Sequence, residues 1–206
     1  MASPQGSIVA GIAIAHSGCS SRGPTPADVD RYAERIVRPS DPQTAAARAY
    51  YLQNPSLSTC GLTVLGCWRL AGLLDAEVAG AYYPGRVGQA FSNMETVASR
   101  YGAWEGGAPR GLLLAGDVWI ITDAAGGDGH TGIATTDIDP ATGLVQTVEG
   151  GQADVMGSTG TGAFTRALRL VGGVWLMGTR RLYGWTRAEL LPIPLATAPT
   201  DPAPAA

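Results

Sequence analysis

Few side chains in this sequence could carry nucleophilic chemistry, because the chain has only three cysteines and two histidines. Cys60 follows Ser58 and Thr59, either of which can cap a helix, so we expect it in the first helical turn. There, unpaired backbone N–H groups and the helix dipole favour a thiolate and lower the thiol pKa. The alternative is a small, packed thiol without reactivity. We interpret Cys60 as the candidate nucleophile.

Cys67 differs from Cys60 in its surroundings. It lies inside the apolar run and directly precedes Trp68, two turns after the expected helix start. At that distance the helix N-terminus does not lower the pKa of the Cys67 thiol. We therefore predict that Cys67 is a core residue.

A cysteine nucleophile also needs a general base, and His130 is the candidate. It opens an expected strand directly after the glycine-rich "GGDG", where a loop gives the side chain access to solvent. His16, the other histidine, lies in the N-terminal segment. The alternative for His130 is a structural or surface histidine.

The third role, orienting the imidazole, falls to Glu149 or Gln152. If "DIDPATG" forms a hairpin turn, His130 faces the stretch "EGGQ" across the ladder. Side chains alternate between the two faces of a strand, and Glu149 and Gln152 are an odd number of residues apart. A regular ladder therefore places only one of them on the same face as His130. A bulge at the intervening glycines would soften this exclusion. The sequence leaves the choice open, as it does the alternative that Glu149 is an exposed strand carboxylate.

The elements that must position these residues come in two blocks. Helical spacing is expected first and short β-branched strands afterwards. The expected helices cover residues 27–37, 42–55, 60–82 and 86–104, and the expected strands cover 116–124, 130–139, 144–152, 164–178 and 180–194. Helices followed by antiparallel strands predict an α+β domain with its helices packed on one side of a sheet.

The boundaries of the domain follow from composition. We expect a flexible or strand-like leader over residues 1–24, a folded domain over 25–195 and a disordered Pro/Ala tail over 196–206. Residues 8–15 form a short apolar stretch, which raises the alternatives of an export signal or of a lipid anchor at Cys19. The absence of Lys or Arg before Ser7 and the presence of His16 argue against these alternatives.

The bulk composition excludes several function classes. With a net charge of −3 and no run of basic residues, the sequence predicts no nucleic-acid partner. Without a CxxC pair, it predicts no metal site, and no motif indicates a cofactor. No apolar stretch reaches the length of a membrane span.

The motifs "STCGLTVLGCWRL", "GDVWII", "GHTGIATTD" and "VQTVEGGQ", taken in order, resemble the papain-fold peptidoglycan hydrolases of the CHAP and NlpC types. The resemblance covers roughly residues 56–155. It implies a papain-like fold with Cys60 as nucleophile, His130 as general base and Glu149 as orienting residue. An oxyanion would be held by the backbone N–H of Cys60 and an upstream polar residue, Gln53 or Asn54.

The activity implied by this resemblance is the hydrolysis of amide bonds in peptidoglycan stem peptides through a thioester. Its substrate would be a wall peptide or another peptide. Because no convincing export signal is present, such an enzyme would be made in the cytoplasm and delivered by lysis or a secretion system. The alternatives are a non-catalytic binding module of the same fold and a cysteine protease or deamidase that acts on protein. The oligomeric state is not predicted.

Overall fold

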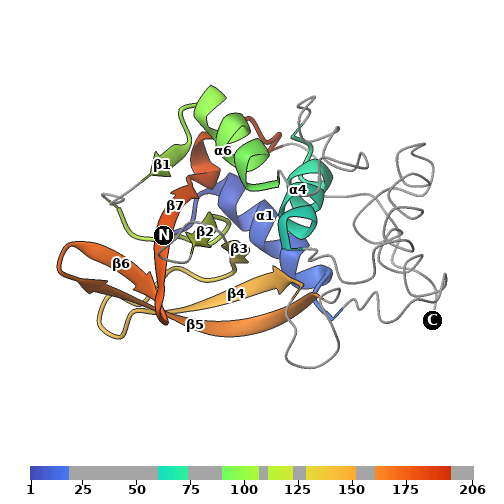
Figure 1. The fold of residues 1–206 in the computed structure, drawn as a ribbon. Helices are drawn as coiled ribbons and strands as arrows, with labels where there is room; N and C mark the ends of the chain where they lie inside the picture. Colours follow the sequence, from blue (N-terminus) through green and yellow to red (C-terminus); the bar gives the residue numbers. More distant parts are fainter. Residues whose placement is uncertain (19–59, 74–89, 107–110, 123–128, 152–160, 196–206) are drawn as a thin grey trace, which may run out of the picture.

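A closed antiparallel barrel of six strands lies at the centre of the structure, which is a computed structural model (Figure 1). The structure describes residues 1–18, 60–73, 90–106, 111–122, 129–151 and 161–195. The six strands are β2 (Val118–Thr122), β3 (Gly129–Ala134), β4 (Leu144–Gly150), β5 (Thr161–Val171), β6 (Val174–Met177) and β7 (Arg180–Thr186). Their order is β7-β2-β3-β4-β5-β6, and the ring closes because β6 also pairs with β7.

The closing contact is a tight hairpin. Leu176 pairs with Arg181 and Met177 pairs with Arg180, so only two residue pairs join β6 to β7. A seventh strand, β1 (Trp104–Gly106), pairs with the other end of β7 through Thr186, Trp185 and Gly184. Along one edge of β7, the first residues of the strand therefore pair with β6 and the last residues pair with β1.

The expected papain-like α+β fold, with N-terminal helices packed against an antiparallel sheet, is wrong for the described residues. The sheet closes into a barrel, and strands outnumber the three α-helices. Alternation in the sequence marks an inner and an outer face of each strand. It does not show that β6 pairs with β7 as well as with β5, so barrel closure was not visible in the pattern.

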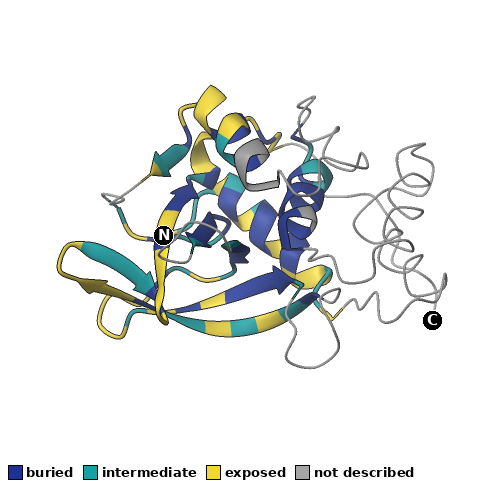
Figure 2. Ribbon diagram, in the orientation of Figure 1, coloured by how far each residue is buried: buried dark blue, intermediate teal, exposed yellow. Residues whose placement is uncertain are grey.

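Two hydrophobic cores lie on the two faces of the barrel wall. Buried residues are coloured dark blue in Figure 2. The inner core consists of Leu113, Trp119, Ile121, Ala134, Ile138, Val145, Leu168, Met177, Leu182 and Trp185. The outer core joins the outward-facing side chains of β2, β3 and β4 to the helices. Neighbouring residues alternate between the cores, as Ile120 (outer) and Ile121 (inner) do.

Three α-helices are described: α1 (Pro4–Ala15), α4 (Cys60–Leu70) and α6 (Ala90–Arg100). Helix α4 packs against β3 and β4 and also contacts the other two helices. A short 3-10 helix, η2 (Ala188–Leu190), follows β7. No helix among the described residues is long and apolar enough to cross a membrane.

Helix α1 corrects the expectation of a flexible or strand-like leader for residues 4–15. The Ser3 hydroxyl accepts a hydrogen bond of 3.0 Å from the backbone N–H of Gly6, and Pro4 begins the helix, so the N-terminus is well capped. Val9 and Ala13 are fully buried in the outer core. This apolar stretch is therefore part of the folded body.

The segment before β2 approaches α1 closely. A Cβ atom on Gly116 would lie 2.2 Å from the Cα atom of Gly6, and the φ of Gly116 is +91°, so both space and conformation require glycine there. The next residue, Asp117, accepts hydrogen bonds from the backbone N–H groups of Leu114 and Ala188. Burial raises the pKa of Asp117 to about 6, although these hydrogen bonds act to lower it.

Most of the expected strands agree with the structure, including the hairpin that joins β3 to β4. Asp139 closes its turn by accepting hydrogen bonds from the Ala141 backbone N–H and the Thr142 hydroxyl, and Gly143 follows with a φ of +72°. Of the expected helix at 86–104, residues 90–100 form α6, Trp104 begins β1, and residues 86–89 lie outside the described residues. The expected helices at 27–37 and 42–55 and the tail at 196–206 lie outside the described residues.

Candidate functional site

Helix α4 and strand β3 bring the candidate nucleophile and the candidate base together. Cys60 is the first residue of α4, and His130 is the second residue of β3, against which α4 packs. The Cys60 side chain interacts with the His130 ring, and this interaction acts to raise the pKa of His130. Both residues are buried, each with 6% of its surface exposed.

The carboxylate of Glu149 holds the other side of the imidazole. Its Oε2 atom lies 2.8 Å from Nε2 of His130. Glu149 is fully buried. With Nε2 engaged by the carboxylate, a proton exchanged between the ring and the Cys60 thiol would use Nδ1.

The register of the β3–β4 hairpin explains why Glu149 reaches His130. Glu149 pairs with Gly132, so His130 is its diagonal neighbour on the same face of the ladder. That face also carries Ala134 and Val145, which belong to the inner core. The side chains of His130 and Glu149 therefore meet on the inner face of the barrel wall.

Gly132 leaves the space in which Glu149 turns toward His130. A Cβ atom at this position would lie 2.7 Å from Cγ of Glu149 and 2.6 Å from Cζ2 of Trp119. Such distances are far below van der Waals contact, so a side chain here would displace both neighbours. The glycine in "GHTG" is thus part of the site, although it contributes no functional group.

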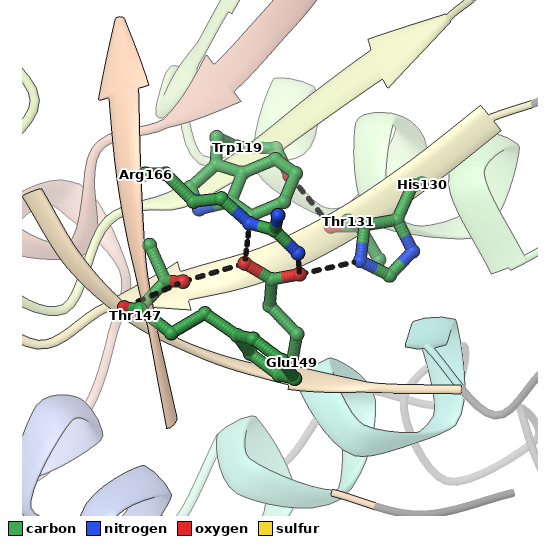
Figure 3. A network of polar contacts seen from close by, with 7 residues as sticks. Trp119, His130, Thr131, Thr147, Glu149 and Arg166 are labelled. Atoms are coloured by element: carbon green, nitrogen blue, oxygen red, sulfur yellow. Dashed lines mark hydrogen bonds and ion pairs between the residues drawn. The ribbon is translucent and has the colours of Figure 1, made fainter. Parts of the chain in front are cut away.

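Two further side chains hold the Glu149 carboxylate (Figure 3). Arg166 donates from Nε to Oε1 at 2.7 Å and from a terminal nitrogen to Oε2 at 2.5 Å, which is a two-pronged ion pair. The Thr147 hydroxyl donates to Oε1 at 2.5 Å. With His130, these donors use both carboxylate oxygens, as a fully buried carboxylate requires.

The network shifts the pKa values of His130 and Glu149 in opposite directions. Burial acts to lower the pKa of His130, but hydrogen bonds and charges from Cys60 and Glu149 raise it above its ordinary value. Burial acts to raise the pKa of Glu149, but hydrogen bonds from Arg166, His130 and Thr147 hold it below its ordinary value. The arrangement therefore favours a protonated imidazole beside an ionised carboxylate.

Trp119 on β2 and Thr131 on β3 confine the imidazole. The rings of Trp119 and His130 meet edge to face, with centroids 5.6 Å apart. The Thr131 hydroxyl donates a 2.7 Å hydrogen bond to the carbonyl of Trp119, which fixes β3 against β2 beside the ring. The position of the histidine is thus set by packing as well as by Glu149.

The other residues considered from sequence have different locations. Cys67 is fully buried in the outer core, as predicted. The ring of His16 donates from Nδ1 to the carbonyl of Ile12 in its own helix, at 2.9 Å. Gln53, Asn54, Gln152 and Cys19 lie outside the described residues, and so do the cap candidates Ser58 and Thr59.

Sequence reasoning missed Arg166, Thr147, Gly132 and Trp119. A signal for Arg166 does exist: it lies two residues before Leu168 on β5, so it shares the inward face of that core residue. Its guanidinium carbon lies 4.9 Å from the centroid of the Phe164 ring, along which the side chain reaches Glu149. An arginine at an inward position indicates a buried acidic partner.

Within the described ranges, no three His, Cys, Asp or Glu side chains gather in a way that could hold a metal ion. The sequence matches no protein-family model, and a search among curated proteins also finds no match. The resemblance to the CHAP and NlpC types therefore stays a prediction. The chemistry of the site has to be argued from its geometry.

Proposed function

We propose that this protein is a cysteine hydrolase that cleaves amide bonds by acyl transfer. The observation that carries the proposal is that two groups act on one buried imidazole: the Glu149 carboxylate lies 2.8 Å from Nε2 of His130, and Cys60 acts to raise the pKa of the same ring. A nucleophile, a base and a group that orients the base are the parts that this reaction needs.

In the first half of the reaction, the Cys60 sulfur attacks the carbonyl carbon of the amide. His130, having taken the thiol proton on Nδ1, gives that proton to the leaving amine as the carbon–nitrogen bond breaks. In the second half, His130 removes a proton from water, and the resulting hydroxide attacks the thioester carbon. The acid product leaves, and the thiol regains its proton.

The charges of the site suit this cycle. With a thiolate and an imidazolium present, Cys60 and Glu149 carry two negative charges, and His130 and Arg166 carry two positive charges. With a neutral thiol and a neutral ring, Glu149 and Arg166 still balance each other. No step leaves a net charge in the buried network, which would otherwise be costly.

Peptide amides of peptidoglycan are the substrates that we propose. This part of the proposal is supported by the motifs around Cys60, His130 and Glu149, which resemble those of wall-cleaving amidases and endopeptidases of the CHAP and NlpC types.

The test is to incubate purified peptidoglycan with the wild-type protein, Cys60→Ala and Cys67→Ala, and to identify released fragments by mass spectrometry. Cys67→Ala is the matched control, because it removes a thiol that lies in the outer core. We expect new peptide termini from the wild type and from Cys67→Ala, and none from Cys60→Ala. Undigested material in all three reactions would exclude peptidoglycan as the substrate, and equal digestion by Cys60→Ala would exclude the cysteine mechanism.

A further inference from the structure

A cavity of about 480 Å³ lies beside the candidate base. The strands β2, β3 and β5 and the β6–β7 turn contribute its walls. Its lining residues are Ile121, His130, Thr165, Arg166, Ala167, Arg169, Met177, Gly178, Thr179 and Arg180. Because His130 forms part of the wall, a group held in this cavity would lie beside the ring of the candidate base.

The lining of this cavity is strongly basic. Three of its residues are arginines and none is acidic. Arg166 is neutralised by Glu149, but within the described part of the chain the side chains of Arg169 and Arg180 make neither an ion pair nor a hydrogen bond. The two guanidinium groups therefore leave an excess of positive charge at the cavity.

This excess of positive charge at the cavity contrasts with the whole chain, which is acidic and has a net charge of −3. The structure places the two arginines on different elements that meet at this point. Arg169 lies on β5, opposite Leu176 of β6, and Arg180 begins β7 directly after the turn. Two guanidinium groups at one wall can bind a single planar anion by charge-assisted hydrogen bonds.

We propose that this cavity binds a carboxylate of the substrate next to the scissile amide, through Arg169 and Arg180. The inference rests on the proposed function, since it describes how the same site selects peptide substrates. A carboxylate is the anion that peptides carry close to their amide bonds, at the C-terminus or on acidic side chains. The protein would then prefer an acidic peptide to its amidated counterpart.

The test uses two alkylating reagents of similar size that differ in charge, the anion iodoacetate and neutral iodoacetamide. Peptide mass spectrometry gives the rate at which each reagent modifies Cys60, and the iodoacetate-to-iodoacetamide ratio reports the attraction of a carboxylate to the site. The wild type is compared with Arg169→Ala/Arg180→Ala. Arg181→Ala is the matched control, because Arg181 neighbours Arg180 on β7 and does not line the cavity.

We expect the double variant to lower the rate ratio at Cys60 by roughly three- to tenfold, and Arg181→Ala to leave it unchanged. The imidazolium of His130 also attracts iodoacetate, but it does so equally in all three proteins. An unchanged ratio in the double variant, or an equal fall in the control, would overturn the inference. Because all three arginines are exposed, circular dichroism should show the same fold in every protein.

A second measurement tests binding itself. N-acetylalanine, which has a free carboxylate, should slow the reaction of Cys60 with iodoacetamide in the wild type, whereas N-acetylalaninamide should not. In the double variant this protection should disappear. Equal protection by both compounds would contradict the inference. Failure of the proposed function would look different, since Cys60 would then react with iodoacetamide as slowly as Cys67.

Discussion

His130 is the residue on which the proposed chemistry depends, because it contacts both the thiol and the carboxylate. Its raised pKa means that the folded protein holds the ring proton more tightly than the unfolded chain does. The resulting stabilisation is complete below the unfolded pKa of about 6.5. It is lost as the pH rises through the higher pKa of the folded state, and the imidazolium that protonates the leaving amine is lost with it.

The first prediction concerns Glu149→Gln. The glutamine removes the negative charge beside the ring, so we expect the pKa of His130 to fall and the alkaline limit of activity to move to lower pH. NMR titration of the His130 ring protons measures this shift without a substrate. Glu189→Gln, an exposed change on η2, is the control and should leave the titration unchanged.

Glu149→Gln should also destabilise the fold, because Arg166 loses its charge partner. We expect a loss of about 3 kcal/mol in the free energy of unfolding, with a partial recovery in Glu149→Gln/Arg166→Gln, where both charges are absent. Urea titration measures both values. If His130 keeps its pKa in the single variant, Glu149 does not orient the base.

Cys60, His130 and Glu149 could be proposed from the sequence, whereas the residues that contact them were missed. Cys60 and His130 are distinctive because cysteine and histidine are rare in the chain. The choice between Glu149 and Gln152 depended on one residue of hairpin register, and the observed pairing of Glu149 with Gly132 puts Glu149 on the face of His130. The contact with Arg166 joins strands β4 and β5, and no local pattern specifies that distance.

At the scale of elements, the β3–β4 hairpin sets the geometry of the site. Its turn at Asp139–Gly143 fixes the register, and the register places Glu149 diagonally from His130. Gly132 then provides the space through which the carboxylate passes. Turn chemistry was readable from the sequence, whereas the need for a glycine opposite Glu149 became apparent only from the packing against Trp119.

The second prediction concerns Gly132→Ala. The new methyl group would meet Glu149 and Trp119, so we expect a loss of roughly 1–3 kcal/mol in the free energy of unfolding and a lower pKa of His130. Gly11→Ala is the control, because a Cβ atom on Gly11 has no neighbour within 4 Å. Thermal unfolding and NMR titration give both quantities, and a Gly132→Ala protein identical to the wild type would refute this role.

At the scale of the whole molecule, the barrel and the N-terminal helix depart most from the sequence-based expectation. The apolar residues of α1 suit a leader, a strand or a buried helix, and local patterns do not distinguish these. Its burial depends on the outer face of β2, β3 and β4, which lie more than a hundred residues further along the chain. Barrel closure likewise depends on two residue pairs between β6 and β7.

The third prediction tests whether α1 belongs to the folded body. Val9→Asp places a charge in the outer core, where Val9 is fully buried, and should lower the free energy of unfolding by at least about 3 kcal/mol. Ile14→Asp makes the same chemical change at a side chain of α1 that is 55% exposed, and should alter stability by less than about 1 kcal/mol. Equal effects in urea titrations would mean that α1 does not pack against the barrel.

The most direct test of the account is the rate at which iodoacetamide modifies each cysteine near pH 6.5, in the wild type and in His130→Gln. An unperturbed thiol, with a pKa of about 8.5, is almost entirely protonated at this pH. If Cys60 is a thiolate paired with His130, we expect iodoacetamide to modify Cys60 about tenfold faster than Cys67 or more. In His130→Gln we expect the rate at Cys60 to fall to that at Cys67. Equal, slow modification of both cysteines in the wild type would contradict the claim that Cys60 is an activated nucleophile.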